Sequence, residues 1–296
     1  MRKLILDTDI GSDIDDAVCL AYLLARPDCD LLAITTVSGE PEQRAMMASA
    51  QCVAAGRSVP IVAGVAAPLL VEPRQPKAPQ SQMLDRWPHE RNFAQGQAIE
   101  FLRSTIRANP GEVTLLAIGP LTNIALLFKT DPGVIGLLKE FVIMGGDFRM
   151  PPPPNWKGTL WEWNIYCDPH AASIVFNSGV PMRAVGIEVT SQVVMPANEV
   201  RERFKPHALL HPVLDFAEVW FRDSHGGITF HDPLAAVAIF EPDVCGFVRG
   251  VSSVDLNEGS DHARTHWRDG AAGHHQAAKT VNPALFFERY FCAFGG

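Results

Sequence analysis

The chain has 296 residues, of which 47% are hydrophobic and 20% are charged, as in ordinary globular proteins. A chain of this length can bury a large core, so disorder, collagen and coiled coil are excluded as descriptions of the whole. The 33 acidic and 25 basic side chains give a net charge of −8, which argues against nucleic-acid binding.

The cysteines and the N-terminus bear on where the protein works. The six cysteines are scattered and form no C-x-x-C pair, which favours a reducing compartment. The apolar run Leu4–Leu6 is too short for a signal-peptide core. No uninterrupted apolar stretch reaches the length of about 18 residues that a membrane span needs. We therefore expect a cytoplasmic protein without membrane contact.

Strand-like and helix-like patterns alternate along the chain. As far as residue 144 they predict strand Leu4–Leu6, helix Asp16–Ala25, strand Leu31–Val37, helix Glu42–Ala55, strand Ile61–Ala63, helix Phe93–Ala108, strand Val113–Ile118, helix Leu121–Lys129 and strand Phe141–Met144. Beyond it they predict helix Asp168–Asn177, strand Ala184–Val189, helices Asn198–Phe204, Val213–Arg222 and Asp232–Phe240, strands Val248–Asn257 and Ala277–Val281, and helix Pro283–Phe294.

This alternation is typical of an α/β protein with a mostly parallel sheet covered on both faces. We expect a single doubly wound domain over residues 1–296. Two predicted loops, Ala66–Pro88 and Pro151–Leu160, are long for simple connectors. Because such loops often carry function, both are candidate lids over a binding site.

The most informative segment lies between the first predicted strand and the first predicted helix. Residues 7–16, DTDIGSDIDD, hold five carboxylates in ten positions. Crowded carboxylates raise one another's pKa, and a bound cation offsets their repulsion. Oxygen ligands without a neighbouring His or Cys favour Ca²⁺ or Mg²⁺ over zinc. Ligands bind beyond the carboxyl ends of strands in open α/β sheets, so this segment predicts a metal site.

Two other interpretations of this segment stay open. In the first, it is a solvated acidic turn in which Asp15 caps the next helix, although capping accounts for one or two carboxylates and not for five. In the second, the chain is a phosphatase of the haloacid dehalogenase type, with Asp7 as nucleophile and Asp9 as general acid. That family normally has Thr or Val where this chain has Gly11.

Several later segments, taken in order with the acidic one, resemble a known family. They are Thr35-Thr36-Val37-Ser38-Gly39, Gly119-Pro120-Leu121-Thr122-Asn123-Ile124-Ala125, Val142-Ile143-Met144-Gly145-Gly146, Trp161-Glu162-Trp163-Asn164-Ile165-Tyr166-Cys167-Asp168-Pro169 and His231-Asp232-Pro233-Leu234-Ala235. Each motif alone is weak, but together they resemble the inosine-uridine-preferring nucleoside hydrolases from Leu4 to about Phe291.

The resemblance implies hydrolysis of the N-glycosidic bond between a ribose and a nucleobase, in a homodimer or homotetramer with one bound Ca²⁺. Carried over motif by motif, it implies metal ligation by Asp9, Asp16, the Thr122 backbone carbonyl and Asp232. It further implies that Asp9 is the general base that activates a water on the metal. Ribose would be bound by Asp15, Glu162 and Asn164, and His231 would be the leaving-group acid.

Some of these positions have simpler interpretations, and some depart from the family pattern. His231 could be an ordinary helix-start residue, and Asp232 only a helix cap before Pro233. Glu40 stands where the family usually has Asn, and Trp156 replaces another Asn, with Asn155 beside it. Glu40 and Asn155 are therefore expected substrate contacts whose change could alter the sugar.

These departures motivate alternative functions. One is a hydrolase of the same fold that acts on a different N-riboside. Another is a nucleoside or ribose sensor that binds without turnover. The phosphatase that uses Asp7 is the third.

Overall fold

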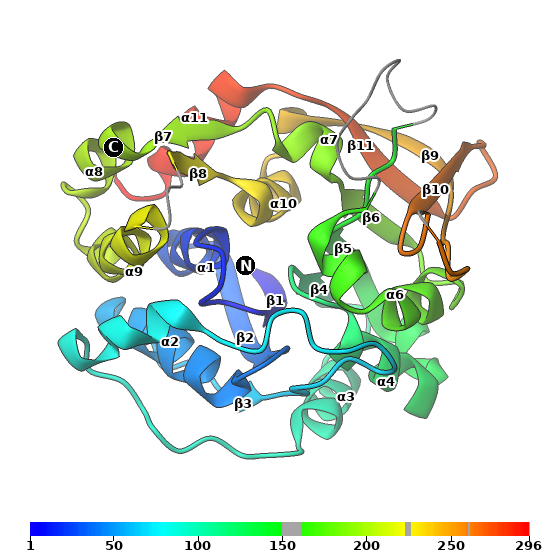
Figure 1. Cartoon of the computed structure of the whole chain (residues 1–296), viewed down its shortest axis with the longest axis horizontal. Coiled ribbons are helices and arrows are strands. Elements are labelled where there is room, and N and C mark those ends of the chain that lie inside the picture. The colour runs from blue at the N-terminus through cyan, green and yellow to red at the C-terminus, as the bar shows by residue number, and fades with distance from the viewer. Residues whose placement is uncertain (150–160, 223–225, 260, 296) are drawn as a thin grey trace.

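The computed structural model describes residues 1–149, 161–222, 226–259 and 261–295. Its strands are β1 (Arg2–Thr8), β2 (Cys29–Thr36), β3 (Ile61–Ala63), β4 (Val113–Ala117), β5 (Leu138–Met144), β6 (Met182–Val185), β7 (Val194–Pro196), β8 (Gly227–Thr229), β9 (Cys245–Val254), β10 (Thr265–Asp269) and β11 (His275–Val281). Among these residues, nine strands form one sheet in the order β10-β9-β11-β6-β5-β4-β1-β2-β3, and β7 pairs with β8 separately (Figure 1).

Helices alternate with these strands. The α-helices are α1 (Asp15–Ala25), α2 (Pro41–Ala54), α3 (Ala98–Ala108), α4 (Thr122–Thr130), α5 (Trp163–Cys167), α6 (Pro169–Phe176), α7 (Ile187–Thr190), α8 (Ala197–Phe204), α9 (His211–Arg222), α10 (His231–Phe240) and α11 (Pro283–Cys292). The 3₁₀ helices are η1 (Pro79–Arg86), η2 (Pro132–Leu137), η3 (Ala208–Leu210) and η4 (Pro242–Val244).

The large sheet separates two hydrophobic cores. Leu4 and Leu6 of β1 face one core, which contains residues of α1, α2, α9, α10 and α11. Ile5, between them, faces the other core, with residues of α3, α4 and α6. Strand side chains alternate in direction, so a strand segment buried on both faces is apolar at successive positions, as Leu4–Leu6 is. The prediction of an α/β fold with a mostly parallel sheet is confirmed.

The order of the strands fixes where a ligand can bind. From β1 the chain runs outward through parallel strands β2 and β3, and then returns to place β4 on the other side of β1. The two connections leave β1 in opposite directions, which opens a crevice at the carboxyl ends of β1 and β4. Residues 9–16 of the acidic segment follow β1 directly and therefore lie in this crevice.

One predicted strand is partly wrong. The apolar, β-branched run Ala184–Val189 predicts a strand, but β6 ends at Val185 and residues Ile187–Thr190 form α7. The neighbouring strand β5 also ends here, with Met144 opposite Val185. The Ile187 N–H then donates to the Gly146 carbonyl at 2.9 Å, which turns the chain out of the sheet. Tertiary packing therefore overrides the local propensity.

Other differences concern boundaries and short elements. The helix predicted from Phe93 begins at Ala98, and the loop predicted over Ala66–Pro88 contains η1. The short strands β7, β8 and β10 were not predicted; β10 is a polar edge strand without an apolar run. The second long loop, Pro151–Leu160, lies within residues 150–160, outside the described residues.

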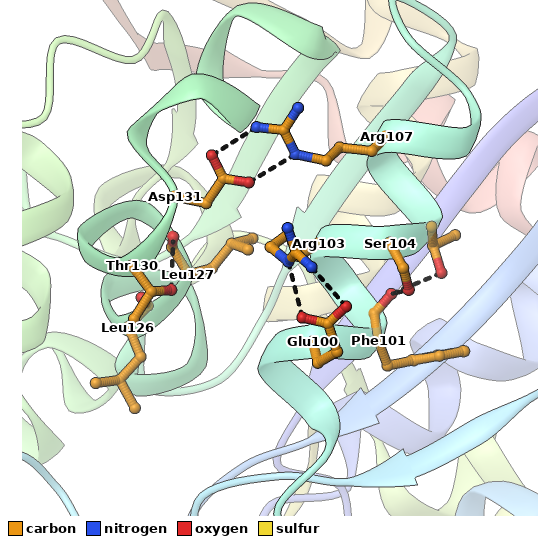
Figure 2. A network of polar contacts seen from close by, with 10 residues as sticks. Glu100, Phe101, Arg103, Ser104, Arg107, Leu126, Leu127, Thr130 and Asp131 are labelled. Atoms are coloured by element: carbon orange, nitrogen blue, oxygen red, sulfur yellow. Dashed lines mark hydrogen bonds and ion pairs between the residues drawn. The ribbon is translucent and has the colours of Figure 1, made fainter.

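Surface ion pairs lie along α3 and at the end of α4. Arg103 binds Glu100 through two hydrogen bonds of 2.8 Å, and Arg107 binds Asp131 through two of 2.7 Å (Figure 2). Exposed pairs of this kind contribute little to stability because water and salt screen them. Within the described part of the chain, no helix is long and apolar enough to cross a membrane.

Candidate active site

A cavity of about 630 Å³ occupies the crevice, within the usual range for small-molecule sites of about 300–1,000 Å³. Its acidic lining residues are Asp9, Asp13, Asp15, Asp16, Glu162 and Asp232. Its apolar lining comes from Pro76, Pro79, Ile118, Met144, Trp163, Ile187 and Trp220. The cavity therefore combines a strongly acidic part with walls suited to an aromatic or apolar group.

Three carboxylates from opposite ends of the chain meet in this cavity. One oxygen from each of Asp15, Asp16 and Asp232 lies within 4.8 Å of the others. Asp15 and Asp16 begin α1, and Asp232 lies in the first turn of α10. The Asp232 backbone N–H also donates to Asp15 Oδ2 at 3.1 Å. The contact between α1 and α10 thus assembles the cluster.

Asp9 joins this cluster from the loop after β1. Its backbone N–H donates to Asp16 Oδ1 at 3.2 Å, and the Thr8 hydroxyl donates to the same oxygen. A side chain on Gly119 would place its Cβ 2.7 Å from Asp9 Oδ1, so the glycine leaves room for the carboxylate. The structure therefore brings Asp9, Asp15, Asp16 and Asp232 to one cavity, as the sequence predicts.

Burial raises the pKa of all four carboxyls. None of Asp9, Asp15, Asp16 and Asp232 is more than 5% exposed. After burial, repulsion from neighbouring aspartates is the next cause of the raised pKa of Asp15, Asp16 and Asp232. Two like charges about 4 Å apart repel by about 4 kcal/mol at an effective dielectric constant of about 20. Full ionisation of this cluster therefore needs a compensating positive charge.

The donor set fits a hard divalent cation. Every ligand offered by the three-carboxylate group is an oxygen, and no His or Cys belongs to it among the described residues. Carboxylate oxygens are the ligands of Ca²⁺ and Mg²⁺. A solvated acidic turn does not describe these side chains, because they are buried.

Arg44 is a fully buried cation behind the acidic loop, and sequence patterns gave no sign of it. Its guanidinium donates to the carbonyls of Asp9, Ile10, Gly39 and Lys77, and to the Ser12 hydroxyl. Because these partners are backbone carbonyls and a hydroxyl, the Arg44 side chain holds three loops together. The loops that follow β1 and β2 are thereby tied to the segment before η1. Its positive charge also lowers the pKa of Asp9 and Asp16, although burial still leaves both raised.

Glu162 and Asn164 are fixed at the start of α5. Glu162 caps this helix, since its carboxylate accepts from the backbone N–H groups of Asn164 and Ile165, and it also accepts from Gly146 at 3.1 Å. Burial nevertheless raises the pKa of Glu162, while these N–H groups lower it. The Asn164 amide donates to the carbonyls of Ile118, at 2.8 Å, and Met144, at 3.2 Å.

His231 lines the same cavity from the first residue of α10. Its Nδ1 lies 2.6 Å from the Thr190 hydroxyl. Thr190 is therefore a second residue of the site, after Arg44, that no sequence motif indicated. Burial lowers the pKa of His231 to about 4, so the imidazole is neutral at pH 7. Neutral His231 can donate a hydrogen bond but carries no positive charge.

Not all predicted residues line the cavity. The Glu40 carboxylate accepts from Lys77 Nζ at 2.6 Å and from the Ala78 N–H at 2.9 Å, and Glu40 is not a lining residue. Thr122 begins α4, and its hydroxyl donates to Asp168 at 2.7 Å. Metal binding by its carbonyl stays a prediction. Asn155 lies outside the described residues.

Asp7 is held away from the cavity. It is completely buried in β1, where one carboxylate oxygen accepts from Thr35 and from Asn123. Burial raises the pKa of Asp7 to about 7. A nucleophile must reach its substrate, so this position argues against a phosphatase that uses Asp7.

The sequence and the fold of this chain are both similar to those of nucleoside hydrolases. The family model described as "Inosine-uridine preferring nucleoside hydrolase" matches residues 4–288. Uridine nucleosidase 1 of Arabidopsis thaliana is 34% identical over 268 residues, covering 86% of this chain and 78% of that protein. Inosine-uridine preferring nucleoside hydrolase of Leishmania major is 33% identical over 272 residues, covering 86% and 84%. A solved plant nucleoside hydrolase superposes with a TM-score of 0.80 at 25% identity, covering 99% and 98%.

The buried guanidinium gives a first prediction. Arg44→Met should lower the free energy of unfolding by about 3–5 kcal/mol, because several buried carbonyls lose their donor. Urea unfolding followed by circular dichroism measures this change. Arg103→Met, an identical substitution at the surface pair of Figure 2, should leave the unfolding midpoint unchanged. Equal effects of the two substitutions would contradict the proposed role of Arg44.

The buried carboxyls give a second prediction, about pH. Because their pKa is raised in the folded state, the folded chain binds more protons than the unfolded one above about pH 4. Stability of the metal-free protein should therefore fall as the pH rises from about 4 to beyond 7. Melting temperatures at several pH values, with and without calcium chloride, measure this. Calcium should reduce the fall, and so should Asp232→Asn; a fall that neither one changes would show that the cluster is not its cause.

Proposed function

The chain belongs to the inosine-uridine preferring nucleoside hydrolase family, and from this membership we propose that it hydrolyses ribonucleosides to free base and ribose with the help of Ca²⁺. Family membership supports hydrolysis of an N-glycosyl bond. The observation that supports the proposed chemistry most directly is the group of buried carboxylates in the cavity at the carboxyl ends of β1 and β4.

The residues proposed to hold calcium are Asp9, Asp16, Asp232 and the carbonyl of Thr122. Asp16 and Asp232 belong to the three-carboxylate group together with Asp15, and Asp9 lies beside that group, with its backbone N–H bonded to Asp16. The oxygen-only donors and their raised pKa values support this assignment, because a cation would favour the ionised carboxylates. When bound, calcium would supply a hard positive charge that can orient a water and the vicinal hydroxyls of the sugar.

Glu162 and Asn164 are proposed to bind the sugar. Both Asn164 N–H groups are directed to protein carbonyls, so its oxygen is the atom left to accept a bond from a ribose hydroxyl. Glu162 is held in one orientation by three backbone N–H groups. Its charge would stabilise the positive charge that develops on the sugar as the glycosidic bond breaks.

Asp9 is proposed to accept the proton of the attacking water. Its backbone is fixed on both sides, by the bond from its N–H to Asp16 and by the bond that its carbonyl accepts from Arg44. A general base must lie within hydrogen-bond reach of the proton that it takes, so a fixed backbone is a condition for this role. Neutral His231, whose Nδ1 is bonded to Thr190, would donate its other ring N–H to the departing base.

One specific observation favours the alternative function, hydrolysis of a different N-riboside. Glu40 is engaged with Lys77 and Ala78 and does not line the cavity, so the sugar contact expected there is absent among the described residues. A panel of ribosides decides between these substrates. Location in the cytoplasm and assembly into a homodimer or homotetramer stay predictions from the sequence.

Removal of the proposed base gives a third prediction. The wild-type chain with calcium chloride should release ribose from at least one purine or pyrimidine nucleoside, and a chelator should abolish this activity. Asp9→Ala should lower kcat by about 100- to 10,000-fold, the usual contribution of a general base. Asp85→Ala, at an exposed position of η1, should retain wild-type kcat. Wild-type turnover by Asp9→Ala would refute its role as base.

His231 gives a fourth prediction, based on leaving groups. His231→Ala should slow nucleosides by about 10- to 100-fold, because their bases leave poorly without a proton or hydrogen bond. A 4-nitrophenyl riboside has a good leaving group and should be slowed less than about threefold. The measurement compares kcat/KM for both substrates in both proteins. Equal slowing of the two would argue against a leaving-group role.

A further inference from the structure

Gln75 is a buried polar residue in the cavity for which family membership and the sequence motifs assign no role. It comes from the long connection between β3 and α3, just before η1, and is 8% exposed. It lines the cavity together with Asp9 and Trp163. A buried amide must satisfy both its donor and its acceptor, so its partners reveal what holds it in place.

The two ends of the Gln75 amide bind different walls of the cavity. Its nitrogen donates to Asp9 Oδ2, and its oxygen accepts from the Trp163 indole N–H at 2.7 Å. The partners fix this orientation, because a carboxylate only accepts and an indole N–H only donates. Gln75 therefore connects the carboxylate proposed as base to an aromatic ring of the apolar wall.

The backbone on both sides of Gln75 is anchored as well. Arg74 donates to the Tyr166 carbonyl at 2.6 Å, and its guanidinium stacks 3.7 Å from the centre of the Tyr166 ring. On the other side, a Cβ on Gly39 would come within 2.5 Å of the Pro76 backbone, which shows how closely the two loops pack. The amide is thus presented to Asp9 by a fixed segment and not by a free loop.

We propose that Gln75 is a positioning residue that holds the Asp9 carboxylate and the Trp163 ring in their working orientations. Hydrogen bonds to an ionised acceptor are about twice as strong as neutral ones, so this amide can select one orientation of Asp9. Small misplacements of a reacting group cost large factors in rate. The inference rests on the function proposed above, since the rate concerned is that of riboside hydrolysis.

The isosteric substitution Gln75→Glu separates this role from simple packing. Glu has the same shape and can still accept from Trp163, but when ionised it cannot donate to Asp9 and adds a like charge beside it. Gln75→Glu should therefore lower kcat by about 30-fold or more, with KM changed less than threefold. Gln75→Met, which loses both bonds without adding charge, should lower kcat by about 10-fold.

The control is Gln82→Glu, an identical substitution at an exposed position of η1, which should keep wild-type kcat and KM. Melting temperatures confirm that each variant is folded under the assay conditions. If Gln75→Glu is folded and keeps kcat within twofold of wild type, the positioning role is overturned. If the wild-type chain itself hydrolyses no riboside, the proposed function fails first, so the two failures are distinguishable.

Discussion

The crowding of buried acidic side chains is the constraint around which this molecule is organised. Asp9, Asp15, Asp16 and Asp232 are almost inaccessible to water, and each has a raised pKa. Repulsion between such groups opposes folding unless they are protonated or paired with a cation. Without a bound cation, this arrangement therefore lowers the stability of the fold. A hard cation bound among the carboxylates would offset their repulsion.

The fold meets this constraint by bringing together two helix starts, at Asp15 and His231, that lie far apart in the sequence. Parallel strands β1 and β4 end side by side, which opens the crevice, and α1 and α10 start from its edge. The first turn of a helix stabilises negative charge because its backbone N–H groups are unpaired and its dipole is positive there. Asp15 and Asp16 use this effect in α1, and Asp232 uses it in α10. The contact from the Asp232 N–H to Asp15 joins the two helix starts.

Most strands of the large sheet, the larger helices and the acidic segment could be predicted from the sequence, because each leaves a local pattern. Leu4–Leu6 is an apolar run, and the carboxylates that follow it are too many for a turn. Arg44 and Gln75 left no such pattern: a buried arginine in a helix and a glutamine in a proline-rich loop look like surface residues. Their roles depend on which loops meet in space, and that information is not local. The same holds for α7, where packing decided between strand and helix for a β-branched run.

Glu40 shows how one departure from the family motif is accommodated. It adopts a left-handed backbone conformation, with φ of 55°, which is unfavourable for a residue with a side chain. Its bonds to Lys77 and to the Ala78 N–H offset this strain and tie it to the segment Gln75–Pro79. Arg44 binds the same segment through a hydrogen bond to the Lys77 carbonyl. A position expected to contact the sugar has therefore become an anchor for one wall of the cavity. Since that wall contributes Gln75, Pro76, Lys77 and Pro79 to the lining, Glu40 bears on the cavity through the segment that it holds and not through its own carboxylate.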